Sequence, residues 1–169
     1  MKLAVTDACI FIDLYELQLT SKFFQLELEI HTSIDVFNEL FEDQQELLRA
    51  YQNTNKLYLH NLTEEDRLEM SKTDFLKGLS LSDKTVLFIA EKIGAMVISS
   101  DKAVRKQAKK QSVEYHGMLW VLDILVEQRL IENQMALSKL RLLISSNVIY
   151  QNNVELRFEL ANRIKLWAE

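Results

Sequence analysis

The sequence has little of what several protein classes require. Proline is absent and only three glycines occur, which excludes a proline-rich linker, a collagen-like repeat and a glycine-rich phosphate loop. The one cysteine, Cys9, excludes an intrachain disulfide. The longest apolar run, at 118–126, is interrupted by Asp123 and is shorter than the roughly 20 residues that span a bilayer. No basic segment leads into an apolar stretch at the N-terminus, so we expect a cytoplasmic protein without a secretory signal.

The residues that are present indicate one globular domain. Of the 169 residues, 48% are hydrophobic and 27% are charged, and this apolar share argues against disorder. The length suits one domain, so we expect a single domain over 1–169, with a core at about 2–116 and a helical C-terminal extension at about 117–169. A net charge of −5 argues against binding nucleic acid over a broad surface, although a local basic strip is compatible with it.

Short apolar strands alternate with helical segments up to about residue 116. Strands are expected at 2–6, 29–33, 56–60, 95–98 and, at an edge, 113–115. Helices are expected between them, one of which covers 36–47, and again at 118–128, 134–144 and 153–167. The alternation predicts an α/β fold with a central parallel sheet between two layers of helices, followed by C-terminal helices.

Acidic residues follow several of these strands, at the sheet edge where parallel sheets bind ligands. Asp7 directly follows the first strand, and Asp101 follows the 95–98 strand after two serines. Glu39 lies on the helix after the second strand, and Asp83 lies in the first turn of its helix. If the strands are neighbours, these carboxylates face one crevice.

Each of these acids also has a purely structural interpretation. Asp83 can complete a capping box with Ser80, Asp101 can cap a helix, and Glu39 can be a solvated helix residue. Asp7 is the hardest to explain in this way, because a charge at the end of a buried strand needs a partner.

Four carboxylates in one crevice would raise one another's pKa values, and a divalent cation would remove that repulsion. Donors that are all oxygen favour Mg²⁺ or Mn²⁺ over zinc, which prefers histidine and cysteine. Such a site can hold a phosphate oxygen and activate a water for in-line attack. The three histidines, His31, His60 and His116, lack metal-ligand spacing, and we interpret them as ordinary strand residues.

Four segments carry a resemblance to a known family. They are VTDACIFI at 5–12, HTSIDVFNEL at 31–40, LSLSDKTVLFIA at 79–90 and VISSDKAVRKQA at 97–108. In their order and placement they resemble the PIN domain family of metal-dependent ribonucleases, which includes VapC-type bacterial toxins, over about residues 2–116. The continuation GMLWVL at 117–122 and the helices after it resemble a bacterial PIN-like subgroup with a longer helical C-terminus.

The resemblance implies a sheet of order 3-2-1-4-5 and a catalytic site at its carboxyl edge. The residues that it assigns both to catalysis and to binding Mg²⁺ or Mn²⁺ are Asp7, Glu39, Asp83 and Asp101. It implies that water hydrolyses RNA phosphodiesters there. We therefore predict a metal-dependent endoribonuclease, the toxin of a toxin–antitoxin pair.

Two residues beside these ligands bear on activity. Cys9 stands where the family usually has serine, threonine or asparagine, and a thiol is a poorer hydrogen-bond partner for a carboxylate or a metal-bound water. Ser99 stands where threonine is common and keeps the hydroxyl that supports the ligands. Cys9 and the acidic net charge favour an alternative, a catalytically inactive PIN-like module that binds RNA or protein. That alternative predicts four acids that are spread out or used as helix caps.

Two further surfaces point to partners. Basic residues at i, i+3, i+4, i+7 and i+8 share one face of the helix after Asp101: Lys102, Arg105, Lys106, Lys109 and Lys110. Such a ridge suits an RNA backbone, and its alternative is a solvated helix face.

The C-terminal helices are more apolar than surface helices need to be. Most of this is core packing, and the rest could bind an antitoxin segment or form a homodimer, between which the sequence does not decide.

Overall fold

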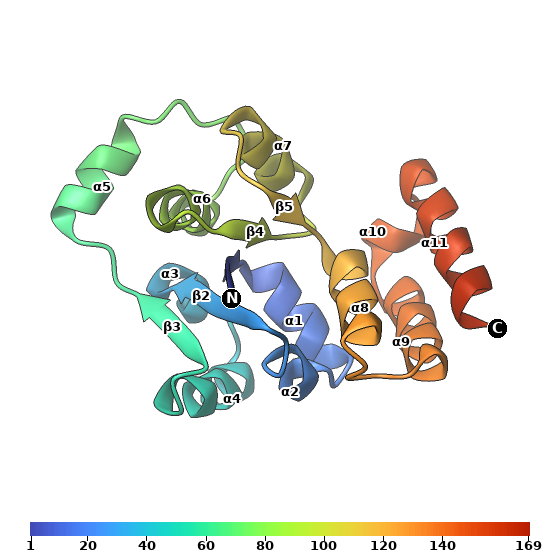
Figure 1. The fold of residues 1–169 in the computed structure, drawn as a ribbon. Coiled ribbons are helices and arrows are strands. Elements are labelled where there is room, and N and C mark those ends of the chain that lie inside the picture. The colour runs from blue at the N-terminus through green and yellow to red at the C-terminus, as the bar shows by residue number, and fades with distance from the viewer.

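The computed structural model describes residues 1–169 and contains one parallel sheet of five strands (Figure 1). The strands lie in the predicted order, β3-β2-β1-β4-β5. Their bounds are β1 (Lys2–Thr6), β2 (Leu28–Ser33), β3 (Leu57–His60), β4 (Met96–Ile98) and β5 (Tyr115–His116). The last three residues of β1 and all of β4 are buried, as in the centre of a parallel sheet covered by helices.

Eleven helices accompany the sheet and give the predicted α/β/α architecture with C-terminal helices. They are α1 (Ala8–Glu16), α2 (Thr20–Phe23), α3 (Ile34–Asn38), α4 (Glu42–Asn53), α5 (Glu64–Ser71), α6 (Leu81–Ile93), α7 (Lys102–Lys110), α8 (Met118–Glu127), α9 (Asn133–Ser146), α10 (Val148–Gln151) and α11 (Val154–Trp167). Figure 1 shows α8 beside the β5 edge of the sheet, with α9, α10 and α11 beyond it.

Helix α6 packs on the central strands and has a clear start and end in the sequence. It contacts β1, β2 and β4 through a buried face that includes Val86, Leu87 and Ala90. Ser80 caps its first turn, and Gly94 ends it in the left-handed conformation that favours glycine, with φ at 68°. These signals fix where α6 begins, and therefore where Asp83 lies relative to the strand ends.

The region 36–47, which the apolar spacing predicts as one helix, instead forms α3 and α4 with a break between them. Leu40 closes a tight turn by donating its amide to the Phe37 carbonyl at 3.2 Å. The Phe41 amide then donates to the Gln44 side chain at 3.1 Å, which caps the start of α4. The predicted edge strand is displaced to Tyr115–His116, and the weakly patterned segment 145–153 contains α10.

The C-terminal helices share one continuous hydrophobic core with the sheet. Leu140 and Leu143 of α9 and Leu160 and Trp167 of α11 are buried in the same cluster as the β1 and β4 side chains. None of the eleven helices combines the length and the apolar character needed to cross a membrane.

This shared core predicts cooperative unfolding. Leu140→Ala removes a fully buried side chain and should lower the free energy of unfolding by about 2–5 kcal/mol. The matched control Leu142→Ala, at a side chain that is 45% exposed, should change it by less than about 1 kcal/mol. Urea unfolding followed by tryptophan fluorescence and by circular dichroism should give one coincident transition. Two separate transitions would make α9–α11 an independent folding unit.

Candidate active site

Asp7 lies at the carboxyl end of the central strand β1 and caps the start of α1. Its side chain is only 3% exposed. The Oδ1 atom accepts hydrogen bonds from the Cys9 thiol at 2.9 Å and from the Ile10 amide at 3.2 Å, and Oδ2 accepts one from the Ser99 hydroxyl. All three donors are neutral, and no lysine, arginine or histidine forms an ion pair with this carboxylate.

The electrostatic setting of Asp7 disfavours its negative charge. Burial raises the pKa of Asp7 to about 6, the hydrogen bonds from its three donors act in the opposite direction, and the nearby Asp83 carboxylate adds to the rise. Burial also raises the pKa of the Cys9 thiol, with the Asp7 charge as a further cause, so Cys9 keeps its proton and donates it. Asp7 is therefore a buried carboxylate without a positive partner, which is the condition that a bound cation would relieve.

Glu39 is held at the end of α3 by a chain of hydroxyl groups. The Ser82 hydroxyl donates to Glu39 Oε1 at 2.8 Å. The Thr85 hydroxyl lies 2.6 Å from the Ser82 carbonyl and 2.8 Å from the Ser33 hydroxyl at the end of β2. Ser33 in turn accepts the amide of Val36 at 3.0 Å and so caps α3. This chain joins β2, α3 and α6 and brings Glu39 next to the start of the helix that carries Asp83.

Asp83 and Asp101 both begin helices. Asp83 exchanges hydrogen bonds with Ser80 in the capping box of α6, at 2.9 and 3.1 Å. Asp101 Oδ1 accepts the amides of Ala103 and Val104 at 2.9 and 3.0 Å and so caps α7. In each carboxylate the second oxygen takes no helix-capping hydrogen bond, so capping does not occupy the whole group.

Asp7, Glu39 and Asp101 follow the ends of β1, β2 and β4, Asp83 lies in the first turn of α6, and the four do not converge into a closed cluster. No three histidine, cysteine, aspartate or glutamate side chains form a group that could hold a metal ion. Asp7 and Asp83 are the two acids whose charges interact. A buried carboxylate without a counter-ion, a second carboxylate near it and only oxygen donors match the chemistry of Mg²⁺ or Mn²⁺. The assignment of all four acids as metal ligands stays a prediction.

Cys9 and Ser99, the two residues predicted to support the ligands, both contact Asp7. Both donate to Asp7, from α1 and from the segment after β4, and their own side chains lie 4.0 Å apart. Ser99 also accepts the amide of Asp101 at 3.1 Å. One hydroxyl thus links Asp7 with the backbone of Asp101 across the two central strands.

Four of the five basic residues line an open groove of 960 Å³ between α7 and the α10–α11 segment, and Asp101 lies on its wall. They are Lys102, Arg105, Lys106 and Lys109. None of these four forms an ion pair. The fifth, Lys110, instead contacts the Asp74 carboxylate at 3.2 Å and does not line the groove. Four of the five basic residues are therefore unpaired and line the groove with Asp101, and Lys110 is paired with Asp74.

The three histidines lie in strands and contact one another or their neighbours. His31 and His60 approach to 2.8 Å between their ring nitrogens, and the other His31 nitrogen lies 2.8 Å from Glu29. Burial is the main cause that lowers the pKa of His60. His116 stacks on Trp120 with ring centroids 4.1 Å apart.

Sequence reasoning missed a second buried acid, Asp13 on α1. Burial raises the pKa of Asp13 to about 6, and its hydrogen-bond donor is the side chain of Asn147, at 3.4 Å. The signal was present in the sequence, because Asp13 lies three residues after Ile10 and four before Leu17, on the apolar face of the helix. Its partner lies 134 residues away, at the start of α10, and no local pattern reveals that contact.

Comparisons with known proteins identify the family and the fold. The family model DUF3368, described as a PIN domain, matches residues 3–158. Among solved structures, the chain is similar to a PilT N-terminus domain protein, SSO1118, from the hyperthermophilic archaeon Sulfolobus solfataricus P2. The TM-score is 0.51 at 15% identity, and the match covers 74% of this chain and 94% of the other, which supports the shared fold alone. No curated protein matches the chain.

The buried charge of Asp7 makes a prediction about stability. Because the pKa of Asp7 is raised on folding, its protonated form stabilises the fold at low pH, and this contribution is lost as pH rises from about 4 through 6. Without divalent cations at pH 7.5, Asp7→Asn should therefore raise the free energy of unfolding by on the order of 1–3 kcal/mol. At pH 4 the gain should largely disappear.

Thermal unfolding at the two pH values measures this effect. Asp43→Asn, at an exposed acid in the first turn of α4, is the matched control and should show no such gain at pH 7.5. A loss of stability in Asp7→Asn at pH 7.5 would show that the carboxylate already has a compensating partner.

Proposed function

Because the chain belongs to the PIN domain family, whose members are generally nucleases, we propose that it is a metal-dependent ribonuclease that hydrolyses RNA phosphodiesters. The observation that carries this proposal is the buried Asp7 carboxylate, which has neutral donors, a neighbouring acid and no basic partner. A carboxylate in that setting favours a cation. The PIN domain match extends through residue 158 and so includes most of the C-terminal helices.

The protein residues have distinct roles in this proposal. Asp7 and Asp83 would hold the cation, and Glu39 and the second oxygen of Asp101 would complete its ligands. A divalent cation bound there would offset the carboxylate charges and activate water for attack on phosphorus. Cys9 and Ser99 would keep Asp7 oriented.

The unpaired lysines of α7 support RNA as the substrate. They follow Asp101 directly and line the same groove, so a phosphate backbone in that groove would pass Asp101. The acidic character of the whole chain would restrict binding to this strip. Arg105, which faces both the groove and a neighbouring pocket, lies closest to the start of α8.

The C-terminal helices support a protein partner for this nuclease. The side chains of Val148, Val154, Phe158 and Leu166 on α10 and α11 are all more than 60% exposed. Exposed apolar groups of this kind mark interaction surfaces. We assign them to an antitoxin, which would make the chain the toxin of a toxin–antitoxin pair, and a homodimer is the other occupant. A small upstream reading frame whose product copurifies with the chain and stops RNA cleavage would support the first assignment.

The helix-capping roles of the candidate acids favour a second candidate function. Asp7 and Asp101 are helix N-caps, Asp83 belongs to the capping box of α6, and no three acids converge in this conformation. These are the features expected of an inactive PIN-like module that binds RNA or protein. Metal binding and RNA cleavage distinguish the two candidates.

Calorimetric titration with Mn²⁺, with RNA cleavage assayed on the same preparations, tests the metal site. The wild type should bind the ion and cut RNA only in its presence. The double variant Asp7→Asn with Asp101→Asn should lose at least tenfold in affinity and all measurable cutting, because two oxygen ligands become amides. The matched double variant Glu42→Gln with Asp43→Asn removes two exposed acids of α4 and should behave as the wild type. Binding without cutting would favour the inactive module, and no specific binding would reject the metal site.

The salt dependence of RNA binding tests the basic strip. In an Asp7→Asn background, which prevents cutting, the affinity for single-stranded RNA should fall with salt. Replacing Lys102, Lys106 and Lys109 together by glutamine should reduce the slope of log affinity against log salt by about 2, at roughly 0.7 per lost phosphate contact. Lys110→Gln is the control, because Lys110 pairs with Asp74, and should leave the slope nearly unchanged. Equal slopes in all variants would remove the strip from the RNA-binding surface.

A further inference from the structure

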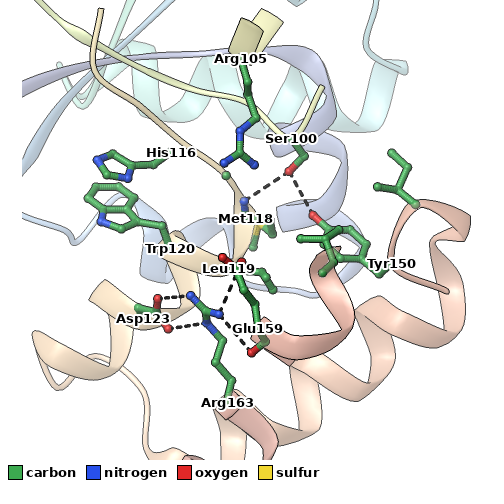
Figure 2. A pocket seen from close by; sticks show the side chains of 13 residues that line it. Ser100, Arg105, His116, Met118, Leu119, Trp120, Asp123, Tyr150, Glu159 and Arg163 are labelled. Atoms are coloured by element: carbon green, nitrogen blue, oxygen red, sulfur yellow. Dashed lines mark hydrogen bonds and ion pairs between the residues drawn. The ribbon is translucent and has the colours of Figure 1, made fainter. Parts of the chain in front are cut away.

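A pocket of 220 Å³ adjoins the groove and lies between the end of β5, the start of α8 and the α10–α11 segment (Figure 2). Its lining includes none of the four acids assigned to the metal. Ser100, the residue before Asp101, lies on its wall, so the pocket adjoins the proposed catalytic site. The C-terminal helices close its far side.

Arg105 supplies the free charge of this pocket. Its guanidinium points into the hollow in Figure 2 and forms no ion pair. A β-carbon at Gly117 would come within 3.0 Å of Arg105 Nη1, so the missing side chain at 117 leaves room for the guanidinium. The backbone of Gly117 is extended, with φ at −113°, and any residue adopts that conformation. A side chain at 117 would therefore have to displace the guanidinium by a few tenths of an ångström.

The acidic groups of the pocket are already paired. Asp123 accepts two hydrogen bonds from Arg163, at 2.9 and 2.7 Å, and Glu159 lies 3.9 Å from the same guanidinium (Figure 2). These groups lie at the opposite end of the hollow from Arg105 in the figure. The two acids and two arginines of the lining sum to zero charge, and Arg105 is the one of these four groups without an ion-pair partner, so its guanidinium is available to an anionic group of a ligand.

Neutral polar and aromatic groups complete the walls. The hydroxyl oxygens of Ser100 and Tyr150 lie 3.0 Å apart, and Ser100 accepts the Met118 amide at 3.3 Å. Burial raises the pKa of Tyr150 to about 12, so its hydroxyl keeps its proton. On another wall, His116 and Trp120 stack with their rings 13° from parallel. The pocket thus combines a cation, hydroxyl groups and a flat aromatic surface.

We infer that this pocket binds one nucleotide, with its phosphate on Arg105 and Ser100 and its base along the Trp120–His116 wall. Guanidinium groups bind phosphate through paired hydrogen bonds, and aromatic side chains bind bases by stacking. The pocket of 220 Å³ shares Ser100 and Arg105 with the groove, so a nucleotide seated in it would lie partly in the groove. The inference extends the proposed function, on which it rests for one point: the nucleotide belongs to the RNA strand and neighbours the nucleotide that is cut.

Trp120 fluorescence reports occupancy directly. Trp167→Phe leaves Trp120 as the single tryptophan, and this protein is titrated in EDTA with each of the four ribonucleoside monophosphates and with inorganic phosphate. At least one nucleotide should quench the emission saturably and bind at least tenfold more tightly than inorganic phosphate, because only the nucleotide stacks. Equal affinity for phosphate and all nucleotides would overturn the inference.

Three variants locate the binding. Arg105→Gln should weaken nucleotide binding at least tenfold, and Gly117→Ala should weaken it several-fold by displacing the guanidinium. Arg157→Gln, at an exposed arginine of α11 that lines neither this pocket nor the groove, should leave it unchanged. Quenching that survives Arg105→Gln, with the circular dichroism spectrum unchanged, would place the nucleotide elsewhere.

The Asp7→Asn variant tests whether the ligand is an RNA strand or a free nucleotide, and whether the pocket binds it independently of catalysis. Asp7 does not line the pocket, so the affinity for mononucleotides should be retained. A short RNA oligonucleotide should quench Trp120 more strongly than the mononucleotide at equal concentration, and the reverse would identify a free nucleotide as the ligand. Nucleotide binding by a wild-type protein that cuts no RNA even with Mn²⁺ present would uphold the pocket and reject the nuclease. If RNA leaves the Trp120 emission unchanged and Arg105→Gln cuts RNA as the wild type does, the nucleotide-binding role of the pocket is rejected and the proposed nuclease function stands.

Discussion

A carboxylate without a counter-ion at the end of the central strand is the constraint around which this molecule is arranged. Asp7 is buried where β1 ends, and the chain offers it a thiol, a hydroxyl and an amide instead of a basic side chain. Each of these donors comes from the first turns of α1 or from the segment after β4, so the two central strands are tied together through the acid. A group that costs stability in the isolated chain is the one best placed to bind a cation.

The same residues serve folding and the proposed chemistry because three of the acids belong to helix-capping motifs. Asp7 and Asp101 are the N-caps of α1 and α7, and Asp83 completes the capping box that Ser80 opens at the start of α6, so the positive ends of these helices lie at the carboxyl edge of the sheet. Helix dipoles favour negative charge at these positions and partly offset the repulsion between the acids. Structural capping and a catalytic role are thus compatible here, since a cap occupies only one side of a carboxylate.

Much of the fold was predictable, and the site only in outline. The apolar residues of β1 and β4 are a local signal that predicts these strands. The N-cap Ser80 and the C-terminal Gly94 are local signals that predict the bounds of α6. The order of the strands came from the family resemblance, since spacing alone does not choose among parallel arrangements. The orientation of Glu39 depends on Ser82, which is 43 residues away, and the side chain that supports Asp13 is 134 residues away. Contacts at such distances leave no periodic trace, and the same is true of the pocket that Tyr150 closes from α10.

The hydrogen bonds that link Ser33, Thr85 and Ser82 restrict how the elements that carry these residues can move. Because Thr85 is fully buried and bonds to both neighbours, the end of β2, the start of α6 and the Glu39 carboxylate cannot shift independently. The buried Thr85 side chain, which no substrate contacts, therefore restricts the movement of the wall that carries Glu39. The geometric demand on position 85 is set by its hydroxyl contacts with the Ser33 side chain and the Ser82 carbonyl rather than by contact with a ligand.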